Sequence, residues 1–144
     1  MKILVPVDGS KYSMEAVKVA LDYAKTKGAE ITLITVAPFI PGLDLEISAK
    51  ELDSLTQKMK RNSEEILEKA QAVLKADGIA SRSILSSSVS AADEIIGVVE
   101  KEKTDLLIIG NRGLGGSATR FFMGSVALKV VSHSPCNVYV VKTA

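Results

Sequence analysis

The chain has 144 residues, of which 47% are hydrophobic and 24% are charged, and its net charge is +1. These values are typical of one soluble globular domain with an ordinary core, so we expect residues 1–144 to form a single domain. The one cysteine excludes an intrachain disulfide, and the one histidine excludes a cluster of soft metal ligands. Zinc fingers and thiol redox pairs are therefore excluded.

The distribution of charge indicates what kind of partner the chain favours. All 17 acidic residues precede Leu106, and the remainder carries four basic residues and no acid, which favours a small anion. Nucleic-acid binders have denser basic surfaces with stacking aromatics, whereas this chain has six Phe and Tyr residues and no Trp. No targeting segment or membrane-spanning apolar run is visible. We expect a cytoplasmic protein without nucleic-acid or membrane partners.

Strand and helix patterns alternate along the first half of the chain. The apolar residues 2–7 predict a strand that stops at Asp8-Gly9-Ser10, a turn with a helix N-cap. Helical spacing from Met14 to Ala24 predicts a helix closed by Gly28. Residues 31–36 predict the second strand, and residues 38–45, with two prolines and a glycine, predict a loop.

The second half continues the same alternation. An apolar stripe predicts a long amphipathic helix that packs on the core and ends at Asp77-Gly78; its members are Leu52, Leu55, Met59, Ile66, Ala70, Val73 and Leu74. Residues 81–85 predict a weak strand near a sheet edge, and Ser90 with Asp93 resembles a capping box before the next helix. Then follow a buried strand at 105–109, a glycine-rich loop at 110–123, a short helix at 125–132 and a last strand, Asn137–Val141.

Five strands separated by four helices predict an α/β fold, doubly wound, with a parallel sheet covered by helices on both faces. The first and fourth strands are the most continuously apolar, so we place them at the centre of the sheet.

The glycine-rich segment after the fourth strand predicts a phosphate-binding loop. It holds half of the ten glycines and opens a helix at Ser125. Glycines let backbone N–H groups approach phosphate oxygens, and a helix N-terminus adds partial positive charge. The Ser125 hydroxyl and the side chains of Arg112 and Arg120 add further donors. A plain surface loop is the alternative interpretation.

Two better-known phosphate motifs do not fit this segment. The P-loop needs a Lys after its last glycine, and Gly124 is followed by Ser125. Residues 113–118 match a dinucleotide fingerprint in form, but they follow the fourth strand and no acid lies downstream to hold a ribose.

Three separated motifs resemble the universal stress protein family over essentially the whole chain. They are Val5-Pro6-Val7-Asp8-Gly9-Ser10, the glycine pair Gly110-x2-Gly113 with Gly124-Ser125, and the closing strand after Pro135. The resemblance implies a Rossmann-like or flavodoxin-like sheet of order 3-2-1-4-5, a homodimer, and ATP as the ligand in the ATP-binding branch. In that order the first and fourth strands are neighbours, and their carboxyl ends form a crevice that binds ligands.

The resemblance also implies which residues bind ATP, either alone or with Mg2+ or Mn2+. Gly110, Gly113, Gly124 and Ser125 match the phosphate and ribose side, with Arg112 adding charge. The adenosine side is matched by Asp8, with Pro6 and Val7, and by the backbone of Val36, and the pocket is flanked by Ile109 and Val126. Asp8 would repel a phosphate, so it is expected to accept from a ribose hydroxyl or the adenine amine, or to hold a metal. A turn or capping role for Asp8 is the alternative.

One spacing departs from the family pattern. Ten residues separate Gly113 from Gly124, where the pattern has nine. An interaction module of the same fold that does not bind nucleotide is therefore the alternative function. A flavodoxin-like or receiver-like domain is a third alternative. It is disfavoured because this chain lacks the stacking aromatics that flavodoxins need and the acidic cluster that receivers need.

Two expectations concern assembly and turnover. The apolar last strand, Asn137–Val141, would lie at a sheet edge, where pairing with a second copy would cover it. No catalytic residue is identified, so we expect ATPase activity to be slow at most.

Overall fold

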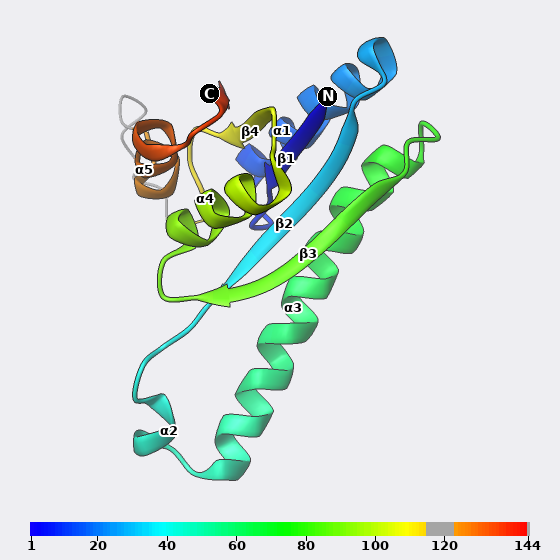
Figure 1. Ribbon diagram of the computed structural model, residues 1–144. Coiled ribbons are helices and arrows are strands. Elements are labelled where there is room, and N and C mark those ends of the chain that lie inside the picture. The colour runs from blue at the N-terminus through cyan, green and yellow to red at the C-terminus, as the bar shows by residue number, and fades with distance from the viewer. Residues whose placement is uncertain (115–122, 144) are drawn as a thin grey trace.

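The computed structural model describes residues 1–114 and 123–143 and forms a single five-stranded sheet flanked by helices (Figure 1). Its elements, in chain order, are β1 (Lys2–Pro6), α1 (Lys11–Lys27), β2 (Glu30–Pro38), α2 (Leu43–Glu46), α3 (Ala49–Lys75), β3 (Ser81–Ser88), α4 (Ala91–Glu102), β4 (Leu106–Gly110), α5 (Ser125–His133) and β5 (Asn137–Val141).

All neighbouring strands are parallel, in the order β3-β2-β1-β4-β5. This confirms the predicted doubly wound α/β fold and the strand order implied by the family resemblance. β1 and β4 lie inside the sheet, side by side, with Ile3 opposite Leu106. The weakly apolar β3 forms one edge and β5 forms the other, as expected.

Side chains that alternate along the strands supply two apolar layers. Ile3 and Val5 of β1 join α1 and α3 on one face, where Val17 and Leu74 are fully buried. Leu4 between them points to the other face, which α4 and α5 cover. Burying both faces explains why β1 reads as a continuous apolar run. The chain leaves β1 towards one face and β4 towards the other.

The predicted helix ends are confirmed where a cap was identified. Ser10 accepts a hydrogen bond from the N–H of Ser13, and Ser90 accepts one from that of Asp93. Gly28 closes α1 in the left-handed conformation, with a φ of 65°, which a glycine adopts without strain.

The segment between the second strand and the long helix differs from the prediction. Pro38 extends β2 because β3 also runs on to Ser88, and the N–H of Phe39 still donates to the Ser88 carbonyl. Residues 43–46 form the single turn of α2 instead of a loop. α3 starts before the apolar stripe because Ser48 caps it and accepts from the N–H of Glu51.

The stripe of α3 is only partly core. Ala70 and Leu74 of the predicted stripe are buried against the sheet, as predicted, and so is Leu67, which the predicted stripe did not include. The first half of α3 extends beyond the sheet together with α2 (Figure 1). Its members Leu52, Leu55 and Met59 are half-buried and belong to neither core cluster. The periodicity marked the apolar side of the helix, but the length of the sheet decides how much of that side is covered.

None of the helices within residues 1–114 and 123–143 combines the length and apolarity needed to cross a membrane.

Candidate functional site

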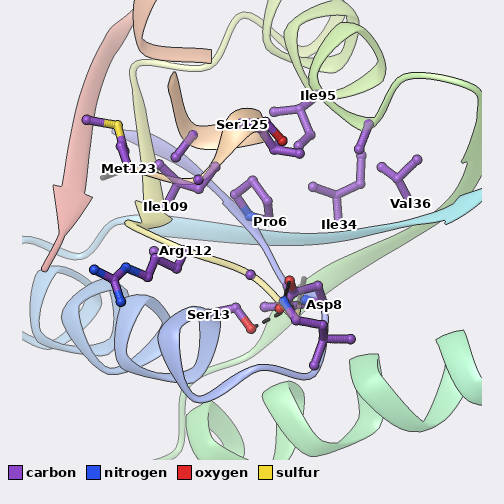
Figure 2. A pocket seen from close by; sticks show the side chains of 18 residues that line it. Pro6, Asp8, Ser13, Ile34, Val36, Ile95, Ile109, Arg112, Met123 and Ser125 are labelled. Carbon is purple, nitrogen blue, oxygen red and sulfur yellow. Dashed lines mark hydrogen bonds between the residues drawn. The ribbon is translucent and has the colours of Figure 1, made fainter. Parts of the chain in front are cut away.

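A cavity of about 510 Å3 lies at the carboxyl ends of β1 and β4 (Figure 2). The two adjacent strands lead to helices on opposite faces, which is the arrangement that opens a ligand crevice in doubly wound sheets. Figure 2 shows Asp8 and Ser13 on the α1 side of this crevice, and Ser125 and Ile95 on the side of α5 and α4.

All the predicted site residues line this one cavity. They are Pro6, Val7, Asp8, Val36, Ile109, Gly110, Arg112, Gly113, Gly124, Ser125 and Val126. The structure thus brings together segments from β1, β2, β4 and α5. Arg120 and the glycines at 115 and 116 lie outside the described residues.

Seven further residues line the cavity and were not identified from the sequence: Ser13, Ile34, Ala91, Ile95, Leu114, Met123 and Ala127. Ile34 and Ile95 lie in apolar sequence patterns that predict core residues. Such a pattern does not indicate that one end of a buried side chain faces a cavity. Ala91 and Ile95 come from the start of α4, an element that no motif had linked to the site. Ser13 could have been identified from the sequence, because it lies one helical turn after the Asp8-Gly9-Ser10 motif.

Asp8 is held in place by backbone donors on both sides of the crevice. Its Oδ1 accepts from the N–H of Ser10 at 2.9 Å, and its Oδ2 accepts from that of Leu114 at 3.2 Å. Its own N–H donates to the Ser13 hydroxyl at 3.3 Å. The turn role considered for Asp8 is therefore present, and the same carboxylate also reaches the glycine-rich segment.

The glycine at position 110 is needed for packing. A Cβ there would lie 2.7 Å from the carbonyl carbon and oxygen of Tyr12 in α1. At Gly124 a Cβ would lie 3.3 Å from the Cα of Arg112, a tight contact with the other end of the same segment. Both glycines thus let β4, α1 and α5 approach closely around the cavity.

The N-terminus of α5 opens onto the cavity without any negative charge in its first turn. Gly124 is the N-cap and supplies no side-chain hydrogen bond. The first backbone bond of the helix runs from the N–H of Leu128 to the carbonyl of Gly124, so the N–H groups of the preceding turn have no acceptor within the helix. Such a terminus favours an anion.

Charged groups around the site are few. Asp8 is the only carboxylate among the described lining residues. In Figure 2 the guanidinium of Arg112 points away from Asp8. On the surface, Lys129 of α5 bonds Asp93 of α4 at 2.9 Å, and this hydrogen bond, with smaller contributions from Ser90 and nearby positive charge, lowers the pKa of the Asp93 carboxyl.

His133 lies at the far end of α5 from the cavity. Its Nδ1 is 3.0 Å from the Lys129 carbonyl oxygen, as expected for a residue that completes a helix C-terminus. Among the residues that the structure describes, no three His, Cys, Asp or Glu side chains gather as a metal site.

Comparisons with known proteins point to one family. The family model of the universal stress protein family matches residues 1–142. A universal stress protein of Methanocaldococcus jannaschii is 36% identical over 144 residues, which cover 98% of this chain and 81% of the relative.

Solved structures share the fold over nearly the full length. The universal stress protein UspA from Lactobacillus plantarum has a TM-score of 0.83 at 25% identity, covering 98% of this chain and 97% of its own. A universal stress protein solved in complex with cAMP has a TM-score of 0.74 at 28% identity, covering 100% and 98%. With the whole chain matched by the family model and by close relatives, the protein belongs to the universal stress protein family.

Proposed function

We propose that the protein binds ATP in the cavity between β1 and β4 and acts as a nucleotide-dependent regulatory or stress-response dimer. The observation that carries the proposal is that residues from six separate elements line one cavity, whose wall includes a helix N-terminus with no side-chain hydrogen bond from its N-cap residue, Gly124. A volume of about 510 Å3 is within the usual range for small-molecule sites. The relative solved with cAMP supports an adenine nucleotide as the ligand.

The two ends of the cavity suit the two ends of a nucleotide. Phosphates fit beside the first turn of α5, where backbone N–H groups and the Ser125 hydroxyl are donors. Asp8 is an acceptor for a ribose hydroxyl or the adenine amine, and its charge disfavours a phosphate at that end. Apolar side chains of Pro6, Val36 and Ile95 supply a wall for the base.

A divalent ion would depend on the phosphates for its coordination. Asp8 offers one carboxylate, and both of its oxygens already accept backbone hydrogen bonds. Mg2+ commonly binds through one or two carboxylates together with substrate phosphates. We therefore propose that Mg2+ or Mn2+ enters with ATP rather than binding first to the protein.

The proposed dimer forms through β5. This strand is a sheet edge in the monomer, and Tyr139 on it is 41% exposed. Antiparallel pairing of Asn137–Val141 with the same strand of a second copy would give the unpaired backbone N–H and C=O groups of this edge hydrogen-bond partners.

Denaturing the gently purified protein and measuring the released nucleotide by mass spectrometry tests the binding proposal. ATP in near-stoichiometric amount, together with calorimetric binding of added ATP to stripped protein, is the expected result. Stripped protein that binds no adenine nucleotide would favour the alternative, an interaction module of the same fold.

A further inference from the structure

The Asp8 carboxylate occupies the space into which a side chain at position 113 would project. A Cβ on Gly113 would lie 2.5 Å from Oδ2 of Asp8, closer than real side-chain atoms approach. Gly113 is not among the glycines with positive φ, so its backbone conformation does not itself demand glycine. The absence of a side chain is explained by the carboxylate beside it.

The Asp8 side chain has little freedom to move aside. Its two oxygens accept from the N–H groups of Ser10 and Leu114, one on each side of the crevice. The turn that carries Asp8 is fixed in addition, because the Ser13 hydroxyl accepts from the N–H of Asp8 and donates to the carbonyl of Ser10. Rotation away from position 113 would break the bond to Leu114.

We propose that Asp8 is a positioning residue that fixes the chain at Gly113 and Leu114, and that Gly113 is glycine to admit the Asp8 carboxylate. β1 and the segment after β4 are then connected by a side chain that is itself fixed by α1. Hydrogen bonds of carboxylates to backbone N–H groups are among the stronger ones, so this bond adds to those of Asn111 in holding the start of the segment.

This connection has a consequence for ligand binding that rests on the proposed function. The N–H of Leu114 is engaged by Asp8 and is not a donor for phosphate. Among the described backbone N–H groups, those in the first turn of α5, on the opposite side from Asp8, are then the donors proposed for phosphate. Gly113, the second glycine of the motif, thus makes room for Asp8, whereas Gly124 and Ser125 form the helix start that binds the anion.

A double-mutant cycle without nucleotide tests the pair. Asp8→Ala, Gly113→Ala and the double variant are compared by thermal unfolding. Gly113→Ala alone is expected to lower Tm clearly, and to lower it far less in the Asp8→Ala background, where the space is free. Asp8→Asn is a control of similar size: it keeps one of the two acceptor oxygens and fills the same space, so Gly113→Ala should remain more costly than in the Asp8→Ala background.

Gly124→Ala provides a second control, because its Cβ would approach Arg112 and not Asp8. Its Tm shift should be the same with and without Asp8→Ala. Equal Tm losses for Gly113→Ala in the parent and Asp8→Ala backgrounds would overturn the proposal.

Amide hydrogen exchange of the unmutated protein tests the bond between Asp8 and Leu114 even if the Asp8→Ala variant does not fold. Leu114 is 72% exposed, so protection of its amide reports the bond to Asp8. We expect exchange at least tenfold slower than for a free amide, and exchange at the free rate would refute the connection. Added ATP should shift the amides of residues 125–127 and leave that of Leu114 protected. Absence of any ATP effect would count against the proposed function alone.

Discussion

The backbone N–H of Gly124 donates to the carbonyl oxygen of Asn111 over 2.7 Å, so the segment between β4 and α5 starts and ends at one place. Asn111 is fixed to β5, because its N–H donates to the Val141 carbonyl and its side-chain oxygen accepts from the N–H of Thr143. The start of α5 is therefore positioned by bonds outside residues 115–122. The additional residue between Gly113 and Gly124 leaves this junction intact.

Replacing Gly110 by Ala should destabilise the fold. The new Cβ would lie 2.7 Å from backbone atoms of Tyr12, which cannot rotate away as a side chain can. Overpacking of this kind costs about 1–3 kcal/mol of unfolding free energy. Urea unfolding of the variant measures the loss.

Gly97→Ala is the matched control for this substitution. Gly97 lies inside α4 and is exposed, and a Cβ there would meet nothing within 4 Å beyond the backbone of its own helix. Ala at a free helical site should stabilise by up to about 1 kcal/mol. A Gly110→Ala protein as stable as Gly97→Ala would contradict the packing argument.

Ser125→Glu should separate binding from folding. A carboxylate in the first turn of α5 interacts favourably with the helix dipole, so stability should be kept or slightly raised. The same charge faces the proposed phosphate site and should weaken ATP binding by about tenfold or more, equivalent to about 1.4 kcal/mol. Isothermal titration calorimetry measures the affinity.

The same charge placed away from the cavity gives the comparison for Ser125→Glu. Ser132 is exposed in the last turn of α5, and Ser132→Glu should leave ATP affinity within about twofold, since it is distant from the first turn. Equal affinities for both variants would mean that phosphate does not bind at the helix N-terminus.

The fold was predictable from the sequence because apolar runs and caps are local. β1, α1 and β5 could be located from their own residues, with Ser10 and Gly28 marking the ends of α1. The site was predictable only in part. Asp8 and the glycines carry a family pattern, whereas Ile34 and Ile95 become lining residues only because α4 packs over β2. The pairing of Asp8 with Gly113 joins segments 105 positions apart, and no local pattern reports such a distance.

Tyr139→Lys should weaken the proposed dimer. Tyr139 is exposed on the edge strand β5, and a charge there opposes close pairing with a second copy. Light scattering should give a dimer for the parent and a monomer of 15.3 kDa for the variant at micromolar concentration. Leu85→Lys, on the opposite edge strand and similarly exposed at 40%, should remain a dimer. A parent protein that is monomeric would contradict the β5 interface.

The ion pair between Asp93 and Lys129 should give a small pH dependence of stability. Hydrogen bonding to Lys129 lowers the pKa of the Asp93 carboxyl below its ordinary value in the folded state. The pair therefore stabilises the fold above the unfolded-state pKa, and this contribution is lost as pH falls through the folded-state pKa. Asp93→Asn should be slightly less stable than the parent at pH 7, and the two should converge at acidic pH.

Unfolding in urea at several pH values measures this convergence, and a Lys129→Met background is the control. There Asp93→Asn should have less effect, because the main cause of the lowered pKa is gone. Both side chains are largely exposed, so the effect should also shrink in high salt. A difference that persists unchanged below the folded-state pKa would show that the charge of Asp93 is not responsible.

ATP turnover should be slow, with ATP acting as a bound signal. Fast hydrolysis needs a water oriented by a base or polar group, together with stabilisation of charge on the transferred phosphoryl group. The one carboxylate in the described lining, Asp8, is on the side away from α5, and His133 is at the far end of that helix. The Ser125 hydroxyl can bind a phosphate oxygen but is a poor base. We expect fewer than about one turnover per second, the low end for ordinary enzymes. A phosphate-release assay on contaminant-free protein checks the rate, and several turnovers per second that disappear in Asp8→Asn or Ser125→Ala would make the protein a true ATPase.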